Sequence, residues 1–318
     1  MITLLSTSCH SYTHQPLQKT DRLDFRVLTY NRAFRAERLP RGTYIFSDLD
    51  RLSYWELELA ARLYRTLQAA GLRVLNDPAR LRQRFPLLRA LQHAGFNRFG
   101  AWTADDPSRP ARYPVFLRTQ CAHRGPLSDL LADEDEIAVA IEAALANGVP
   151  MRELLLVEYC AQPVSENLFR KLATFRVGER MVSTLCVHEG HWAAKYGQLG
   201  IATQELYDDE FAIVDTNRYG EPLRPAFDIG HADYGRADFA LVDGRPQVYE
   251  INTNPMLDPV GQHPFAIRIR ADALFFDRLI DAFCEIDSEG AGPVAIDDAA
   301  LATQRKRDRF VLRSRWTP

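Results

Sequence analysis

The stretch at residues 234–255 constrains the fold of this chain most, because it combines two strand-like runs, a turn and three closely spaced oxygen-bearing side chains. The two runs flank an Asp-Gly pair at residues 243–244, which is typical of a tight hairpin. Alternate residues of a strand share a face, so Glu250 and Asn252 point the same way, and Asp238 comes from the neighbouring strand. The opposite face is apolar and is expected to be buried; it carries Phe239, Leu241, Val248 and Ile251.

Two carboxylates and an amide on one face make a poor core, but they suit a hard cation. Oxygen ligands are the ones that Mg²⁺ prefers, so we predict that Asp238, Glu250 and Asn252 bind Mg²⁺, or Mn²⁺ in its place. Arg236 lies on the same face as Asp238 and offers a guanidinium for phosphate or carboxylate. The alternative is a solvated hairpin with ordinary surface charges.

The bulk composition is that of an ordinary globular protein. The chain has 318 residues, 46% hydrophobic and 25% charged, which allows two or three subdomains. Its formal net charge of −3 gives no indication of nucleic-acid binding, and no apolar run approaches membrane-spanning length. Five scattered cysteines without a CxxC pair predict free thiols, and no signal peptide is recognisable. We therefore expect a cytoplasmic location, with no membrane or nucleic-acid partner.

The N-terminal third alternates between strand-like and helical segments, which predicts a small α/β unit with a parallel sheet. Strands are expected near residues 25–30, 43–46 and 72–75. Ser53 and Glu56 have the spacing of a capping box at the start of a helix between the last two strands. A polar, proline-punctuated connector follows, so the first domain is expected to span residues 1–104.

The second predicted domain spans residues 110–285. Its small subdomain is expected at about 110–160 and its large subdomain at about 161–285, where a long amphipathic helix at 263–284 would pack on a sheet. Beyond it the composition shifts to small and then basic residues. Residues 286–318 are therefore expected to form a linker and a weakly anchored basic tail.

Two motifs carry a family resemblance, namely Arg236-Ala237-Asp238-Phe239 and, after the turn, Glu250-Ile251-Asn252-Thr253-Asn254-Pro255. Together they resemble the metal-binding end of the ATP-grasp fold, which D-alanine–D-alanine ligases, glutathione synthetases and peptide-tailoring ligases share. The resemblance covers roughly residues 72–285. It implies an α/β (α+β) architecture, in which two α+β subdomains clasp ATP and a small α/β pre-grasp domain precedes them.

The same resemblance assigns several cations to the phosphates of ATP. Arg118 ends a strand whose terminal cation contacts the nucleotide in the family, and Lys195 lies in an Ala-Lys-Tyr element that faces it from the opposite wall. Lys171 is a further candidate, and Arg84 stands where the D-alanine ligases place a lysine. The sequence leaves open which of three neighbours faces the nucleotide, namely Arg80, Arg82 or Arg84. Each cation taken alone could equally be solvated.

The apolar strand at residues 154–160 resembles the hinge between the two grasp subdomains. Adenine would then be bound by the backbone of Tyr159 and Cys160, with the Glu158 carboxylate near its amino group. Glu166 is the candidate acid for the ribose hydroxyls, in a register that stays open by one residue. The alternative for the strand itself is a simple buried element.

These features imply an ATP-dependent ligase that activates a carboxylate as an acyl phosphate and joins it to an amine, with release of ADP and phosphate. Arg236 and Lys195 are the expected catalytic residues, because they would offset charge on the reacting groups. The acid and the amine would be small molecules or peptides whose identity the sequence does not fix. A small-molecule phosphotransferase and an inert nucleotide-binding regulatory protein remain alternatives, and a homodimer would fit the resemblance.

Overall fold

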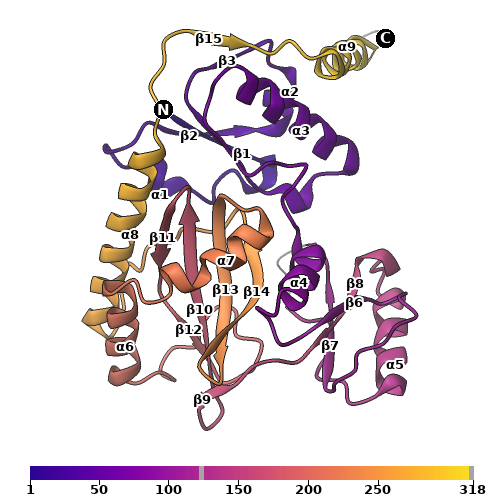
Figure 1. Cartoon of the computed structure of the whole chain (residues 1–318), viewed down its shortest axis with the longest axis vertical. Coiled ribbons are helices and arrows are strands. Elements are labelled where there is room, and N and C mark those ends of the chain that lie inside the picture. Colours follow the sequence, from indigo (N-terminus) through magenta and orange to yellow (C-terminus); the bar gives the residue numbers. More distant parts are fainter. Residues whose placement is uncertain (122–124, 315–318) are drawn as a thin grey trace.

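The computed structural model describes residues 1–121 and 125–314, and the strands in these ranges form four sheets. In Figure 1 a parallel sheet lies at the top, a large antiparallel sheet lies below it, and a three-stranded sheet lies at the lower right. Residues 122–124, which follow the strand that ends near Arg118, and the last four residues of the expected tail fall outside the described residues. No helix within the described ranges is long and apolar enough to cross a membrane.

The N-terminal unit contains the predicted parallel sheet. Its strands, in spatial order, are β2 (Phe25–Thr29), β1 (Ile2–Ser6), β4 (Thr43–Phe46) and β5 (Val74–Leu75). Its helices are α1 (Gln15–Gln18), α2 (Tyr30–Arg35) and α3 (Tyr54–Ala69). The capping box at the start of α3 is present, because the Ser53 side chain accepts from the amide of Glu56, whose carboxylate accepts from the Ser53 amide at 2.9 Å.

The large sheet is antiparallel and its two faces are covered by different helices. Its strands are β11 (Arg180–Ser183), β10 (Leu168–Val177), β13 (Tyr234–Val242) and β14 (Arg245–Asn252), with β9 (Pro163–Ser165) and β12 (Val187–Glu189) also paired to β10. The helices are α6 (Gln204–Asp215), α7 (Gly220–Gly230) and α8 (Ala266–Ile286). Leu172 packs in a cluster with residues of α7, whereas Phe175, on the alternate face of β10, packs with residues of α8.

The three-stranded sheet forms a smaller unit with its own core. It contains β6 (Ala101–Thr103), β8 (Leu154–Glu158) and β7 (Val115–Thr119), with α5 (Glu134–Ala146) packed against it. Because β6 pairs with β8, the expected boundary at residue 104 falls after a strand of this unit. Helix α4 (Arg84–His93) also leaves the N-terminal unit, since it contacts β14 and α7.

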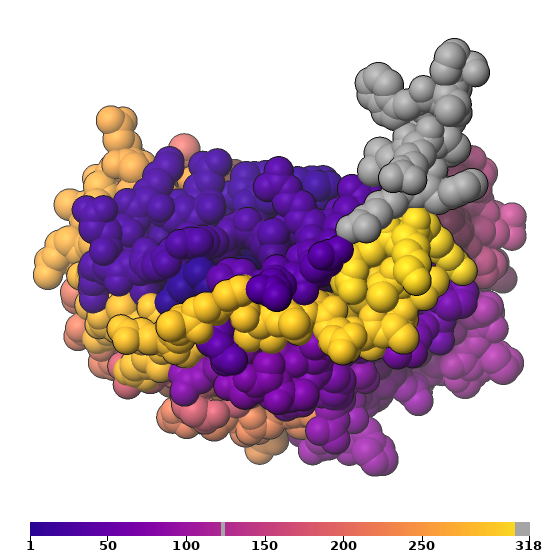
Figure 2. Space-filling model, turned by 90° about the horizontal axis from the view of Figure 1, so that it is seen from above, coloured from indigo at the N-terminus to yellow at the C-terminus, as the bar shows by residue number. Residues whose placement is uncertain are grey.

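The C-terminal segment is anchored on the N-terminal unit, which corrects the expected linker and tail. β15 (Pro293–Ala295) pairs with β3 (Arg38–Pro40), and α9 (Ala299–Ser314) contacts α2 and α3. Leu301 is fully buried in the same cluster as the helices of that unit. Figure 2 shows this yellow segment lying across the indigo N-terminal surface. Polar contacts hold it as well, because Arg35 donates to Asp308 at 2.7 Å and Arg305 donates to the carbonyl of Ala36 at 3.1 Å.

One hydrophobic cluster joins the parallel sheet to the large sheet. It contains Ile2 and Phe25 from the N-terminal unit, Phe175 and Tyr234 from the large sheet, and Phe283 from α8. All five are nearly or fully inaccessible to solvent. These two units therefore share a core, whereas the three-stranded sheet and α5 pack around a separate one.

A buried histidine lies at this junction. His14 is fully buried, and its Nε2 shares a hydrogen bond with the hydroxyl of Tyr234, while its Nδ1 lies 2.8 Å from Oγ1 of Thr13. Thr13 in turn donates to the side chain of Asn254 at 2.8 Å. Desolvation lowers the pKa of His14 from its ordinary value of 6.5 to about 3, so the imidazole is neutral in the folded protein at neutral pH.

We expect the stability of the fold to fall as the pH drops below 6.5. The unfolded chain binds a proton at His14 near its ordinary pKa, whereas the folded chain does not until about pH 3, so acid favours unfolding. The free energy of unfolding should decrease by about 1 kcal/mol between pH 6 and pH 5 from this residue alone. Urea titrations of the wild type and of His14→Gln at both pH values measure it.

The variant should be less stable at pH 7 and show a smaller loss between the two pH values. His93→Gln, at an exposed position, is the matched control and should keep the pH dependence of the wild type. An unchanged slope in His14→Gln would contradict the assignment.

Candidate functional site

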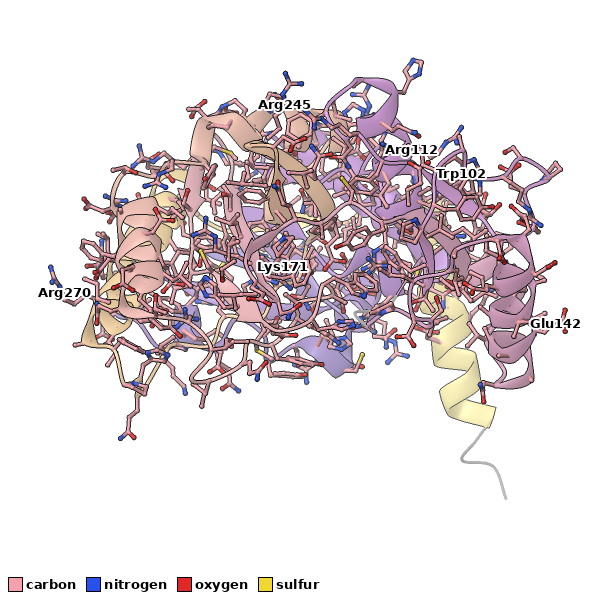
Figure 3. All side chains as sticks on the ribbon, turned by 90° about the horizontal axis from the view of Figure 1, so that it is seen from below. Trp102, Arg112, Glu142, Lys171, Arg245 and Arg270 are labelled. Atoms are coloured by element: carbon pink, nitrogen blue, oxygen red, sulfur yellow. The ribbon has the colours of Figure 1, made fainter. Side chains whose placement is uncertain are left out.

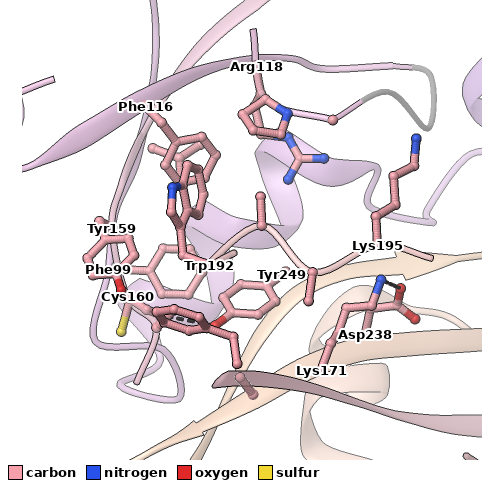
Figure 4. A pocket seen from close by; sticks show the side chains of 18 of the residues that line it. Phe99, Phe116, Arg118, Tyr159, Cys160, Lys171, Trp192, Lys195, Asp238 and Tyr249 are labelled. Atoms are coloured by element: carbon pink, nitrogen blue, oxygen red, sulfur yellow. Dashed lines mark hydrogen bonds and ion pairs between the residues drawn. The ribbon is translucent and has the colours of Figure 1, made fainter. Parts of the chain in front are cut away.

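A cleft of about 960 Å³, measured to its open mouth, lies between the three-stranded sheet and the large sheet. Aromatic side chains line one end of the cleft, and Lys171, Lys195 and Asp238 lie at the other (Figure 4). Seen from below, Lys171 lies near the middle of the molecule, far from the outer edges marked by Arg270 and Glu142 (Figure 3).

The hairpin of β13 and β14 has the predicted turn and places its polar residues on one face. Asp243 and Gly244 have φ values of 49° and 72°, and positive φ at both positions is what a type I′ turn requires. Across the two strands, Asp238 is paired with Glu250, and Arg236 with Asn252. Because residues directly opposite each other share a face, the four side chains gather on the side that also carries Ala173 and Phe175 of β10.

Each acid of the hairpin faces two cations. The buried Asp238 accepts two bonds from Arg236, at 2.7 and 3.1 Å, and lies 3.3 Å from Nζ of Lys171. Glu250 is bonded to Arg84, and its carboxylate lies 3.9 Å from the guanidinium of Arg118. Four cations around two carboxylates leave a positive surplus in this part of the cleft, which suits a polyanionic ligand.

Arg118 is placed to bind an anion. Its guanidinium is buried, and its Nε has no acceptor within the described part of the chain. Burial lowers the pKa of Arg118 to about 10, with the charge of Arg84 adding to the effect and Glu250 opposing it. The side chain is therefore still a cation at neutral pH, with an unused donor that a phosphate oxygen could accept from.

The segment predicted as a hinge borders the aromatic end of the cleft, but several of its groups are already bonded. The buried Glu158 carboxylate accepts from the amide of Gly100 and from Arg112, both at 2.8 Å. It therefore links the end of β8 to the segments that carry these two residues. The amide of Tyr159 donates to the Pro114 carbonyl at 2.9 Å. Within the described ranges the Tyr159 carbonyl accepts no backbone hydrogen bond, and it is the group left for a purine amino group.

Two of the predicted nucleotide-binding residues do not line the cleft. Glu166 is exposed in the turn between β9 and β10. Arg84 is buried and donates to the carbonyls of Thr119 and Gln120 at 2.9 and 3.0 Å, in addition to its bond with Glu250. It therefore ties the end of β7 to the hairpin and acts as a positioning residue. Arg118, Lys171 and Lys195 do line the cleft, as do Glu158, Tyr159 and Cys160.

A turn that carries Lys195 is organised by Glu189, which the sequence did not single out. Oε1 of Glu189 accepts from the amides of Lys195, Tyr196 and Gly197 at 2.8, 2.6 and 2.7 Å. These amides hold the pKa of Glu189 below its ordinary value, although desolvation opposes them. Nζ of Lys195 lies 4.6 Å from the centre of the Tyr196 ring. The only sequence signal was the acid five residues before the Ala-Lys-Tyr element.

The aromatic end was also missed. Trp192 lies between Phe116, at 4.8 Å, and Tyr159, at 5.8 Å and nearly perpendicular to it. Alternation along β7 could have revealed Phe116, since it shares a face with Arg118. Tyr249 could not be found in this way, because it is the extra residue of a β-bulge between Val248 and Glu250. The bulge lets the Tyr249 hydroxyl donate to the carbonyl of Cys160 at 2.7 Å.

The oxygen donors of the hairpin fit a magnesium ion. Asp238 and Glu250 are direct cross-strand partners, and Asn252 follows on the same face with its Oδ1 oriented by the amide of Asn254 at 2.8 Å. No cluster of three or more His, Cys, Asp or Glu side chains within the described ranges could hold a metal. A metal here would therefore need the Asn252 amide as its third protein ligand. That donor set consists of hard oxygens, as Mg²⁺ requires.

Comparison with solved structures shows the fold. The chain is similar to the D-alanine–D-alanine ligase of Bacillus anthracis, with 13% identity and a TM-score of 0.53 over 97% of this chain and 99% of that one. It is also similar to the D-alanine–D-alanine ligase of Coxiella burnetii, with 12% identity, a TM-score of 0.51, and 99% and 98% of the two chains covered. A third similar structure is the VanG D-Ala:D-Ser ligase of Enterococcus faecalis, with 12% identity and a TM-score of 0.51 over 90% of this chain and 98% of that one.

The chain thus has the ATP-grasp fold, as the sequence resemblance predicted. At these identities the likeness concerns the fold alone. No protein-family model matches the sequence, and no curated protein sequence matches it.

We expect Arg84→Met to destabilise the protein by about 3 kcal/mol, because it removes a buried cation from Glu250 and unties two carbonyl groups. Chemical denaturation measures this effect. Arg89→Met, at an exposed position of the same helix, is the matched control and should change the free energy of unfolding by less than about 0.5 kcal/mol. Equal stability of the two variants would show that Arg84 is not a structural tie.

Proposed function

We propose that the protein is an ATP-dependent ligase that joins a carboxylate to an amine. The observation that carries the proposal is the arrangement of the cleft, in which an aromatic end with an unused carbonyl leads to a positive end with two acids and an amide on one face. A purine ring suits the first end and a triphosphate suits the second. The shared fold with ligases supports the same activity at a coarse level.

In this proposal the base of ATP lies among the aromatic side chains, and its amino group donates to the Tyr159 carbonyl. The side chains of Phe116 and Trp192 supply apolar surface for the ring. The phosphates then extend toward Arg118, whose Nε has no acceptor among the residues that the structure describes, and toward Lys171 and Lys195. These cations come from opposite walls of the cleft, so the triphosphate is enclosed by positive charge.

Asp238, Glu250 and Asn252 are the residues that would hold Mg²⁺. When bound there, the ion supplies positive charge to the phosphate oxygens next to the reacting group. The protein prepares the ligands itself. Arg236 fixes the Asp238 carboxylate through two bonds, and Arg84 fixes Glu250, so neither acid has to reorient before it can bind.

The reaction proposed has two steps. An oxygen of the substrate carboxylate attacks the γ-phosphorus, the bond to ADP breaks, and an acyl phosphate forms. The amine nitrogen then attacks the acyl carbon and a carbon–nitrogen bond forms. The bond from that carbon to the phosphate oxygen breaks, its electrons leave with inorganic phosphate, and the proton lost by the nitrogen goes to phosphate or solvent. In this proposal the chain contributes position and charge, and Arg236 and Lys195, which line the same cavity, would offset the negative charge of both steps.

The test combines the purified protein with ATP, MgCl₂, pooled carboxylic acids and pooled amines, and measures phosphate release. Release that requires both an acid and an amine supports the ligase. Release with one acceptor and no amine would instead identify a phosphotransferase. Tight binding of ATP without any release would identify a regulatory nucleotide-binding protein.

We expect Glu250→Gln to reduce turnover by about 100-fold or more, because the neutral amide weakens the metal site and the charge balance around the phosphates. The folded state should persist, as circular dichroism would show. Glu142→Gln, on the exposed face of α5, is the control and should leave turnover unchanged. Full activity in Glu250→Gln would rule out the metal assignment.

A further inference from the structure

A second cavity, of about 710 Å³ to its open mouth, lies on the same face of the large sheet. It shares Lys171, Lys195 and Asp238 with the cleft, so the two cavities meet at these charges. From there it runs between β10 and α8 and is closed on one side by the segment at residues 256–260. Neither the base nor the phosphates of ATP, as proposed above, would extend into the part of this cavity beyond the shared charges.

The mouth of this cavity is positively charged. Lys171, Lys195 and Arg236 line it together with one carboxylate, that of Asp238. Lys171 and Arg236 are paired with Asp238, whereas Lys195 makes no ion pair with any described residue. Three cations against one acid leave room for another anion at the point where the cavity joins the cleft.

Away from its mouth the cavity has a wall with many apolar side chains. Its lining includes Ala173, Phe175, Leu185, Leu257, Phe275 and Phe276. Two charged side chains of its wall already have partners, whereas Asp258, on the segment at residues 256–260, is exposed. Arg268 donates to the buried Glu210 at 2.6 Å and to the Cys186 carbonyl, and Asp272 accepts from the Val260 amide at 2.8 Å. Because Arg268 is already paired with Glu210, the described wall offers no unpaired cation for a second acidic group on a ligand, and Asp258 would repel one. The apolar side chains of the wall are the surface that a ligand would cover.

We propose that this cavity is the pocket for the acid to be activated, and that the acid carries a bulky apolar substituent. The proposal rests on the ligase activity proposed above. The carboxylate would lie at the mouth between Lys195 and Arg236, with its substituent against Phe275 and Phe276 of α8. One carboxylate oxygen then forms the bond to the γ-phosphorus while the bond from phosphorus to ADP breaks.

The experiment uses hydroxylamine as the amine, because it converts an acyl phosphate to a hydroxamate whatever the natural amine is. The acids are acetate, hexanoate, 3-phenylpropanoate and glutarate, supplied with ATP and MgCl₂. We expect kcat/KM for hexanoate and 3-phenylpropanoate to exceed that for acetate by about 10- to 100-fold, since each buried methylene favours binding. Glutarate should be a poor substrate, because its second carboxylate would lie in the apolar interior.

Two variants test the position of the pocket. Ala173→Leu fills the cavity and should reduce kcat/KM for 3-phenylpropanoate by about 10-fold or more while changing that for acetate by less than about threefold. Phe276→Ala enlarges it and should shift the preference toward acids longer than hexanoate. Ile269→Ala, at an exposed position of the same helix, is the control and should keep the preference of the wild type.

The outcomes separate this inference from the ligase proposal. If hydroxamate forms from acetate or glutarate as well as from hexanoate and 3-phenylpropanoate, and neither variant changes these relative rates, the pocket assignment is wrong while the ligase proposal stands. For a chain without turnover, calorimetry with hexanoate and a non-hydrolysable ATP analogue decides. Binding that Ala173→Leu weakens would support the pocket even if the ligase fails, and no binding would overturn it.

Discussion

The cross-strand pairing of Asp238 with Glu250 is the constraint on which the rest of the site depends. Two carboxylates opposite each other repel, so the arrangement persists only because each faces two cations. These cations come from four separate elements, namely Arg84 of α4, Arg118 of β7, Lys171 of β10 and Arg236 of β13. The hairpin therefore contacts charged residues from both walls of the cleft, and removing one of its carboxylates would leave cations on these walls without their ion-pair partner.

The packing of the chain explains why the cleft lies where it does. The parallel sheet and the large sheet share one core, which His14 and Tyr234 cross as a buried polar pair. The three-stranded sheet packs with α5 around a separate core, and a smaller apolar cluster on its other side joins it to α4 and to Tyr249 of β14. The cleft lies at the boundary between these two cores, where a ligand can enter without disrupting either of them.

The sequence predicted those features that short-range patterns encode. Alternation and an Asp-Gly pair were enough for the hairpin and its shared face, and a three-residue spacing was enough for the capping box at Ser53. Features that depend on distant partners escaped it. The anchoring of Leu301 depends on a core built by the first 70 residues, and the bulge at Tyr249 depends on the register of β13 against β14. The charge of Arg84 suits a phosphate ligand. Its structural role is visible only from its partners in the fold, which are the carbonyls of Thr119 and Gln120 and the carboxylate of Glu250.

The two cavities have different chemistry but share one set of charges. Aromatic side chains line the far end of the cleft, and aliphatic and phenyl side chains line much of the second cavity. Lys171, Lys195 and Asp238 lie where the two cavities join. A nucleotide and an acid that each place an apolar group at their own end must bring their anionic groups together at this junction. The two anionic groups would repel each other, and the cations at the junction would reduce this repulsion. Binding energy from apolar burial at the two ends would then hold the reacting oxygen and phosphorus close together. Under the two proposals, selectivity for the acid would reside in the second cavity, whereas the chemistry would depend on the charges that both cavities share.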